Sequence, residues 1–266
     1  MTRAASTGGW ARGTVLALAL AAAVPSAACG EDESADGDGD GESSPAEASA
    51  TLPTGSDQVA LDPAEFTTEI DNPHWPLSPG SRWVYREEDP EGTLRVVVTV
   101  TDRTKTIANG VEARVVHDVV SQDGEPVEVT DDWYAQDAEG NVWYLGEETA
   151  EYEDGEVVSR EGSFEAGSGG AQAGVIMPAD PQPGLEYRQE YLQGEAEDFA
   201  EVLGTDATVE VPFGRFEGAL RTRDTNPLEK PPQVEHKYYA PEIGPVLTID
   251  LASGAREELV AYTPGE

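Results

Sequence analysis

Two alternating segments joined by a tight-turn dipeptide constrain the fold of this chain most strongly. Residues 93–102 place three valines on one side of an extended strand and polar residues on the other. Residues 111–120 alternate in the same way, and Asn109-Gly110 lies between the two segments. Asn-Gly is the dipeptide best suited to a hairpin turn, because both residues tolerate positive φ. The pattern predicts an antiparallel hairpin.

Aromatic hairpins extend this pattern along the chain. Residues 133–136 and 142–145 are predicted strands, joined by a polar turn at 137–141. Residues 238–239 and 245–250 repeat the arrangement further on. Strands that recur every 8 to 12 residues or so with turn residues between them are typical of an antiparallel sandwich or barrel. We therefore predict an all-β fold, an antiparallel meander that forms a curved sheet, an open barrel or a sandwich.

The meander is predicted to consist of two tandem repeats. Several turn residues and aromatics recur at an offset of 104, so that Gly80 corresponds to Gly184 and Gly110 to Gly214. The first repeat covers about 73–170 and the second about 177–266; a chance alignment is the alternative. Residues 195–203 have helical spacing, but the repeat aligns them with the valine strand, and we predict a strand there.

The amino-terminal segment resembles an export signal that ends at the single cysteine of the chain. Two arginines precede an apolar run at 15–24, too short to cross a bilayer as a permanent helix, and Ser26-Ala-Ala-Cys29 follows. Residues 1–28 are therefore predicted to be a signal peptide, and Cys29 to carry the acyl chains that anchor the protein. Bacterial lipoprotein signals commonly have leucine where this chain has Ser26. The alternative is an ordinary secretory cut that leaves Cys29 as a free thiol.

The residues after Cys29 are predicted to form a tether. Residues 31–50 contain eight acidic side chains, no basic side chain and no large apolar one. Such a segment has no large apolar side chains whose burial could offset the conformational entropy lost on ordering. It is therefore expected to be disordered. We assign 29–71 to a lipidated acidic tether and 72–266 to the β-domain.

The charge of the chain limits its partners. Its 53 Asp and Glu against 16 Lys and Arg give a formal net charge of −37. Nucleic acid binding requires cationic side chains to neutralise phosphates, so nucleic acid is not an expected partner. The membrane is expected as a partner only through the lipid anchor. Five basic residues gather in 215–237; they form either a ligand-facing patch or, as we favour, pairs with acidic neighbours on the sheet.

Four aromatic residues are the candidate ligand-facing side chains: Trp133, Tyr134, Trp143 and Tyr144. They alternate across both faces of adjacent strands, so one aromatic row could remain open to a small molecule, a lipid or a polymer. The alternative, which we favour, is a closed barrel in which both rows are core.

No catalytic residue, metal site or cofactor is predicted. The three histidines are not at metal-ligand spacing, and the chain has no nucleophile elbow and no phosphate loop. Residues 137–141 superficially resemble a calcium loop, but a hairpin turn fits them better. A pair of carboxylates acting in hydrolysis stays open as an alternative, because so many acids make no single pair distinctive.

The domain resembles a family of uncharacterised bacterial cell-envelope lipoproteins. The most specific similar segment is Asp132-Trp-Tyr-Ala-Gln-Asp, followed by Gly140-Asn-Val-Trp-Tyr144. Further similar segments begin at Asn72, Val211 and His236, so that the resemblance spans nearly all of 72–250. The family implies no activity and no catalytic residue. A looser similarity to curved-sheet envelope proteins that include lipid or polymer carriers implies a binding role.

These observations together predict a membrane-anchored extracytoplasmic lipoprotein whose β-domain binds or scaffolds a ligand without catalysis. The alternative is an extracytoplasmic hydrolase that uses a carboxylate pair. An aromatic groove without a close carboxylate pair favours the first function, whereas two acids about 5–10 Å apart at the base of a cleft favour the second.

Overall fold

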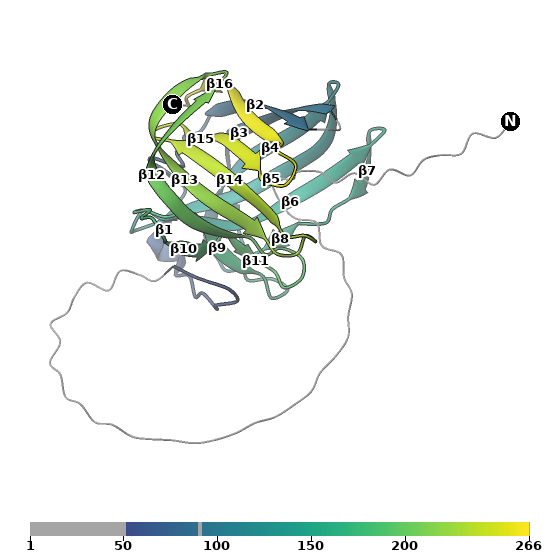
Figure 1. Cartoon of the computed structure of the whole chain (residues 1–266). Coiled ribbons are helices and arrows are strands. Elements are labelled where there is room, and N and C mark those ends of the chain that lie inside the picture. Colours follow the sequence, from purple (N-terminus) through teal and green to yellow (C-terminus); the bar gives the residue numbers. More distant parts are fainter. Residues whose placement is uncertain (1–51, 90–91, 266) are drawn as a thin grey trace, which may run out of the picture.

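The computed structural model describes residues 52–89 and 92–265, and nearly every element in them is an antiparallel strand (Figure 1). The all-β prediction is confirmed. The first half of the chain contains η1 (Pro63–Glu65), β1 (Phe66–Thr67), β2 (Arg82–Asp89), β3 (Gly92–Thr106), β4 (Glu112–Gln122), β5 (Glu125–Asp137), β6 (Val142–Glu153), β7 (Glu156–Ser159), β8 (Phe164–Glu165) and β9 (Gln172–Met177).

The second half contains β10 (Glu186–Arg188), β11 (Glu190–Tyr191), β12 (Phe199–Val211), β13 (Gly214–Asn226), β14 (Gln233–Ala240), β15 (Gly244–Asp250) and β16 (Arg256–Thr263). The strands follow one another in the order β10-β12-β13-β14-β15-β16-β2-β3-β4-β5-β6-β9-β11. Most neighbours along this path are close in sequence, with β16–β2 the pair furthest apart, so the described sheet is a long meander; off the path, β1 pairs with β5. Figure 1 shows it curling into a nearly closed barrel.

The sheet curls back on itself at residues 186–191. This short segment pairs with β12 through β10 and with β9 through β11, so its two ends belong to the two ends of the strand order. Gly174 in β9 permits the contact, because a Cβ at that position would lie 2.1 Å from the carbonyl oxygen of Gln189. We call residues 186–191 and Gly174 the seam. Without a glycine at this point the two edges could not approach so closely.

The amino-terminal boundary of the domain lies earlier than predicted. Residues 52–71, assigned to the tether, pack on the barrel: Ile70 is buried, and Leu52, Val59, Leu61 and Phe66 contact the core. Their apolar side chains bury surface that a solvated tether would leave in water. The rest of the predicted tether, 29–51, and the signal at 1–28 lie outside the described residues.

The buried guanidinium of Arg188 holds this amino-terminal segment at the seam. Its nitrogens donate to the carbonyl oxygens of Gly55, Asp57 and Ala173 at 2.7–2.9 Å. The backbone N–H of Arg188 donates to the carbonyl of Pro53 at 2.8 Å. Because these acceptors come from both the segment and β9, one side chain ties residues 53–57 to the closing strands.

The two predicted repeats share one turn and differ at another. Gly80 and Gly184 both have φ of +87°, and each donates its N–H to a valine of the following long strand, Val100 and Val202, at 2.9 and 2.8 Å. Gly110 has φ of +91° in the β3–β4 turn, whereas Gly214 is the first residue of β13 and lies outside the left-handed region. The first pair of glycines is confirmed as equivalent and the second is not; a duplication of the whole unit stays a prediction.

Two local predictions can be compared with the structure. Of the strand predicted at 195–203, residues 199–203 begin the long strand β12, as the repeat alignment indicated, whereas 195–198 lie outside it in an irregular connection. Residues 107–111 form the turn between β3 and β4, closed by hydrogen bonds between Ile107 and both Gly110 and Val111. Both hairpin strands run further than the alternating segments from which they were predicted.

Replacing Gly174 with alanine tests the seam. We expect Gly174→Ala to lower the free energy of unfolding by about 2–4 kcal/mol, because its methyl group would overlap backbone atoms that cannot rotate away. Gly214→Ala is the matched control, since a Cβ there meets nothing within 4 Å. Denaturant unfolding of both variants checks the prediction; equal stabilities would contradict it.

Candidate functional site

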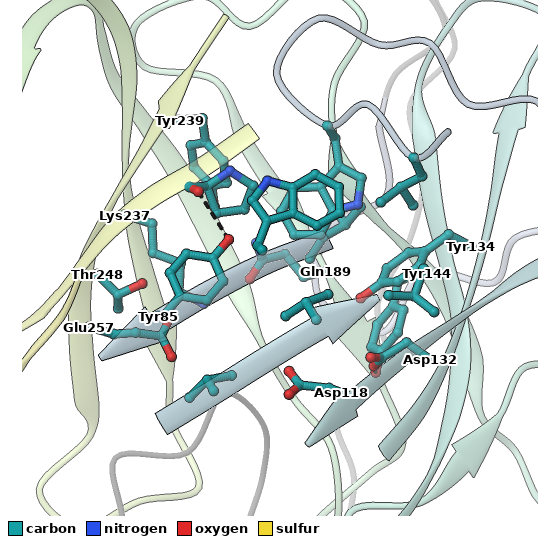
Figure 2. A pocket seen from close by; sticks show the side chains of 18 of the residues that line it. Tyr85, Asp118, Asp132, Tyr134, Tyr144, Gln189, Lys237, Tyr239, Thr248 and Glu257 are labelled. Carbon is teal, nitrogen blue, oxygen red and sulfur yellow. Dashed lines mark hydrogen bonds between the residues drawn. The ribbon is translucent and has the colours of Figure 1, made fainter. Parts of the chain in front are cut away.

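A cavity of about 120 Å³ lies inside the barrel (Figure 2). It is smaller than the clefts of roughly 300–1,000 Å³ that hold drug-sized ligands, and close to the cavity of about 150 Å³ that admits benzene. Strands from both halves of the chain supply its walls. In Figure 2, Asp118, Asp132, Tyr134 and Tyr144 lie on one side, and Tyr85, Thr248 and Glu257 lie on the other.

Aromatic rings make up much of the wall. The cavity is lined by Trp75, Trp83, Tyr85, Tyr134, Tyr144 and Tyr239. The Trp75 ring lies between Tyr134 of β5 and Tyr239 of β14, with ring centroids 5.8 and 5.9 Å away. Tyr134 stacks in turn on Tyr144 at 5.0 Å. Trp75 therefore joins the aromatic walls contributed by the two halves of the sheet.

The loop that carries Trp75 is held by Asn72, which is buried. The Asn72 side-chain amide donates to the carbonyl oxygens of Gly140 and Pro178, both at 3.1 Å, and its backbone N–H donates to Gln136. Asn72 thus ties the loop to the β5–β6 turn and to the end of β9. These contacts position Trp75 against the cavity.

Carboxyl groups face the same cavity. The acidic lining residues are Asp118, Asp132, Glu190, Asp198 and Glu257, and Lys237 is the one basic residue among the described residues of the lining. Burial raises the pKa of Asp132, Asp198 and Glu257 to about 7. Burial likewise raises the pKa of Asp118 and Glu190 well above the usual range. The interior of the barrel therefore favours protonated carboxyl groups at neutral pH.

A half-buried carboxyl group, that of Asp132, and a buried one, that of Glu147, share one phenol. The hydroxyl of Tyr144 lies 2.7 Å from Asp132 Oδ1 and 3.0 Å from Glu147 Oε2. A phenol has one proton to donate, so both contacts can be hydrogen bonds only when one of the carboxyl groups is itself protonated. The raised pKa of both acids agrees with this geometry, with burial as the largest cause for each.

Glu190 lies at the seam and is fully buried. Within the part of the chain that the structure describes, neither of its carboxylate oxygens has a hydrogen-bond partner, and the same is true of Asp198 Oδ1 and Asp118 Oδ1. Lys237 does not relieve them by direct contact, because its ammonium pairs with Asp224 and Glu235 at 3.3 and 3.5 Å. The cavity thus contains carboxyl oxygens without hydrogen-bond partners.

The four predicted aromatic residues separate into two pairs. All four are buried. Tyr134 and Tyr144 line the cavity, whereas Trp133 and Trp143 do not. The Lys105 ammonium covers the ring of Trp133, and Trp143 packs on Phe66 and donates to Asp137 at 2.7 Å. The barrel covers both rows, as the favoured alternative predicted, and one of them faces an interior space.

Residues 137–141 form a hairpin turn and not the calcium loop that was considered as an alternative. Asp137 accepts hydrogen bonds from the backbone and side chain of Asn141, at 2.8 and 2.9 Å, which closes a hairpin turn. Across the described residues, no group of three or more His, Cys, Asp or Glu side chains is arranged to hold a metal ion.

Within the basic stretch at 215–237, ion pairs on the sheet are formed by Arg215, Arg223 and Lys237, as favoured. Arg215 pairs with Glu210 and Glu217, and Arg223 pairs with Glu201 on the neighbouring strand. Lys237 differs from these arginines in that it pairs with Asp224 and Glu235 and also lines the cavity.

The sequence did not identify the interior acids. Asp118 and Glu257 lie among alternating residues, where an acidic side chain ordinarily indicates the solvent face of a strand, and Glu190 and Asp198 flank an irregular connection. One usable signal was present in β14, where Glu235, Lys237 and Tyr239 share a face. A charged pair on the same face as a large aromatic indicates a polar interior rather than an outer surface.

Comparisons with known proteins give limited information. No protein-family model matches the chain, and no curated protein matches it. Among solved structures, one from Bacteroides fragilis NCTC 9343 is named as an exported protein with a YmcC-like fold; it has a TM-score of 0.40 and 15% identity over 71% of this chain and 98% of its own. Another, from Parabacteroides distasonis ATCC 8503, is named as a lipoprotein; it has a TM-score of 0.39 and 12% identity over 71% of this chain and 97% of its own. At this level of likeness, no conclusion about this chain rests on them.

The interior acids predict an unusual dependence of stability on pH. Asp132 and Asp198 have pKa values of about 7 in the folded protein, against about 3.9 for an unfolded Asp. Because the folded state holds these protons more tightly, the stability they confer is complete below about pH 4 and is lost as the pH rises through about 7. We expect the midpoint of thermal unfolding to fall by several degrees between pH 5.5 and pH 8.5.

Neutral replacements supply the control for this prediction. Asp132→Asn and Asp198→Asn should each flatten the pH dependence, and Asp206→Asn, at an exposed position, should leave it unchanged. A midpoint that rises over the same pH interval would contradict the assignment of protonated interior acids.

Proposed function

We propose that this chain is a membrane-anchored extracytoplasmic lipoprotein whose β-domain binds a small ligand inside the barrel without transforming it. The observation that favours binding most strongly is the interior cavity, with aromatic walls and carboxyl groups that lack partners. Most ligand sites are largely apolar spaces with a few convergent polar groups. The interior of this barrel has that composition.

The size of the cavity favours a small molecule over a lipid or a polymer. At about 120 Å³ it suits a ligand of benzene size rather than a whole acyl chain or a glycan. The loop at residues 72–80 bears Trp75, which packs against both halves of the wall, and we infer that a ligand enters where this loop meets the barrel.

The hydrolase alternative has weaker support. Asp132 and Glu147 are close enough to share Tyr144, but the phenol lies between them, in the space that a scissile bond would need. Glu147 is also absent from the cavity lining. A working carboxylate pair flanks its substrate on both sides, and this pair flanks a tyrosine.

The location follows from the sequence at the amino terminus. A short apolar run, small residues and a lone cysteine favour export followed by acylation at Cys29. Cys29 lies outside the described residues, and within the residues that are described no helix is long and apolar enough to span a bilayer. The proposed resemblance to cell-envelope lipoproteins agrees with this location.

Replacing Cys29 with serine tests the anchor. If the acyl chains on Cys29 hold the protein at the membrane, the Cys29→Ser protein should be recovered in the soluble fraction after carbonate washing. Replacement of a serine of the same acidic stretch, Ser43→Ala, should leave the protein in the membrane fraction. Retention of the Cys29→Ser protein in the membrane would count against lipidation.

A pair of benzene-sized probes tests binding inside the barrel. We expect benzyl alcohol or benzylamine at millimolar concentration to raise the midpoint of thermal unfolding, because a ligand of the folded state stabilises it by mass action. Val116→Phe, which fills the cavity from β4, should abolish the shift. Val119→Phe, on the opposite face of the same strand, should retain it. Binding of neither probe to the unaltered protein would overturn the proposed function.

A further inference from the structure

The chemistry of the cavity indicates which kind of ligand it accepts. Ionised carboxylates only accept hydrogen bonds, and tyrosine hydroxyls have one proton each to donate. Five acids line the cavity, and the one lysine among the described lining residues is already paired with Asp224 and Glu235. A ligand that pairs with these carboxyl groups in their ionised form must therefore bring donors.

Glu190 is the acceptor that most needs such a donor. It is fully buried, it faces the cavity, and both of its carboxylate oxygens lack a partner among the described residues. Leaving a buried polar group unpaired costs free energy, so native proteins almost always pair such groups with protein, water or ligand. The neighbouring Asp198 leaves its Oδ1 unpaired beside the same space. Unpaired carboxyl oxygens of two acids that line one cavity favour a positively charged donor.

The walls around these acids suit an organic cation. Trp75, Tyr134 and Tyr239 pack around one side of the cavity, and the faces of aromatic rings attract cations. A bare metal ion would instead require several oxygen ligands converging at bonding distance. An ammonium ion with an apolar body uses both the carboxyl groups and the rings.

We propose that the cavity binds a small organic ammonium ion, an amine with a body of about benzene size, whose N–H groups donate to the Glu190 carboxylate. This inference rests on the proposed function and names its ligand class. The ligand body packs against the aromatic wall, and Asp198 supplies a second acceptor near the charged group.

Binding of the cation displaces a proton. Charged and titratable groups around Glu190 are Asp132, Glu147, Asp198, Lys237, Tyr134 and Tyr144. Burial and the neighbouring acids raise the pKa of Glu190, which favours the protonated form of its carboxyl group in the empty cavity. When the ammonium ion arrives, the Glu190 proton leaves for the solvent and the carboxylate pairs with the ligand. The net charge inside the cavity is unchanged by this exchange, because the carboxylate left by the proton balances the ammonium ion.

Three probes of similar shape and different charge test the proposal. Isothermal titration of the purified full chain at pH 7 would use benzylamine, which is protonated at that pH, benzyl alcohol and benzoate. We expect benzylammonium to bind at least about tenfold more tightly than benzyl alcohol, because hydrogen bonds to a charged group are stronger. Benzoate should show no measurable binding. Titrations in two buffers of different ionisation enthalpy should reveal release of a proton with benzylammonium only.

Glu190→Gln isolates the contribution of the carboxylate. This variant should bind benzylammonium no better than benzyl alcohol, and its affinity for benzyl alcohol should stay unchanged. Glu186→Gln, an exposed position on the adjoining strand β10, is the matched control and should keep the full preference. If Glu190→Gln does not fold, Asp198→Asn should reduce the preference for the cation in the same way.

The outcomes separate the two proposals. Equal binding of benzylammonium and benzyl alcohol to the unaltered protein would overturn the ammonium inference and leave the binding cavity standing. Full preference for benzylammonium in Glu190→Gln would also overturn the role of Glu190. Binding of no probe at all would overturn the proposed function itself.

Discussion

The close approach of β9 and the segment 186–191 is the constraint on which the rest of this structure depends. A meander of long antiparallel strands can stay open or close, and here the two ends of the strand order meet because Gly174 has no side chain. The seam has two consequences. Arg188 ties the amino-terminal segment to the closing strands, and Glu190 comes to face the interior. The contact that closes the sheet therefore also places Glu190 in the wall of the cavity.

The interior of the barrel is only partly an apolar core. Valines and aromatic rings line it, but five acids do so as well. Carboxyl groups transferred from water to such a space lose solvation, and protonation is the least costly response. This explains why Asp132 and Glu147 can share the single hydroxyl of Tyr144, and why the pKa of several interior acids lies near 7. A protein that kept these groups only for stability would be improved by apolar residues of similar volume. Their presence agrees with a role in binding.

Much of the fold could be predicted from the sequence because its information is local. Alternation in 93–102, the turn at Asn109-Gly110 and the aromatic hairpins each specify a strand or a turn without reference to distant residues. The equivalent turns at Gly80 and Gly184 could be found in the same way. Residues 52–71 could not, because their few apolar side chains are scattered among polar ones and acquire a partner only once the barrel exists.

The candidate site was less accessible to sequence analysis. Tyr134 and Tyr144 were identified from aromatic alternation, but the same alternation could not distinguish them from Trp133 and Trp143 on the outer face. Glu190 and Asp198 lie on either side of a short irregular connection, where no periodicity indicates the direction of a side chain. Their position depends on the seam, and the seam depends on residues 15 or more positions away in the chain. A single sequence gives no signal for such a contact.

The central claim is that Glu190 is the partner of a cation inside the barrel. A crystal structure of the protein soaked with benzylamine tests it most directly. The account predicts the ring against the aromatic wall near Trp75 and the ammonium nitrogen within hydrogen-bond distance of the Glu190 carboxylate. A ligand in the cavity with its nitrogen directed away from Glu190, or a cavity that holds water alone under the same conditions, would contradict the account.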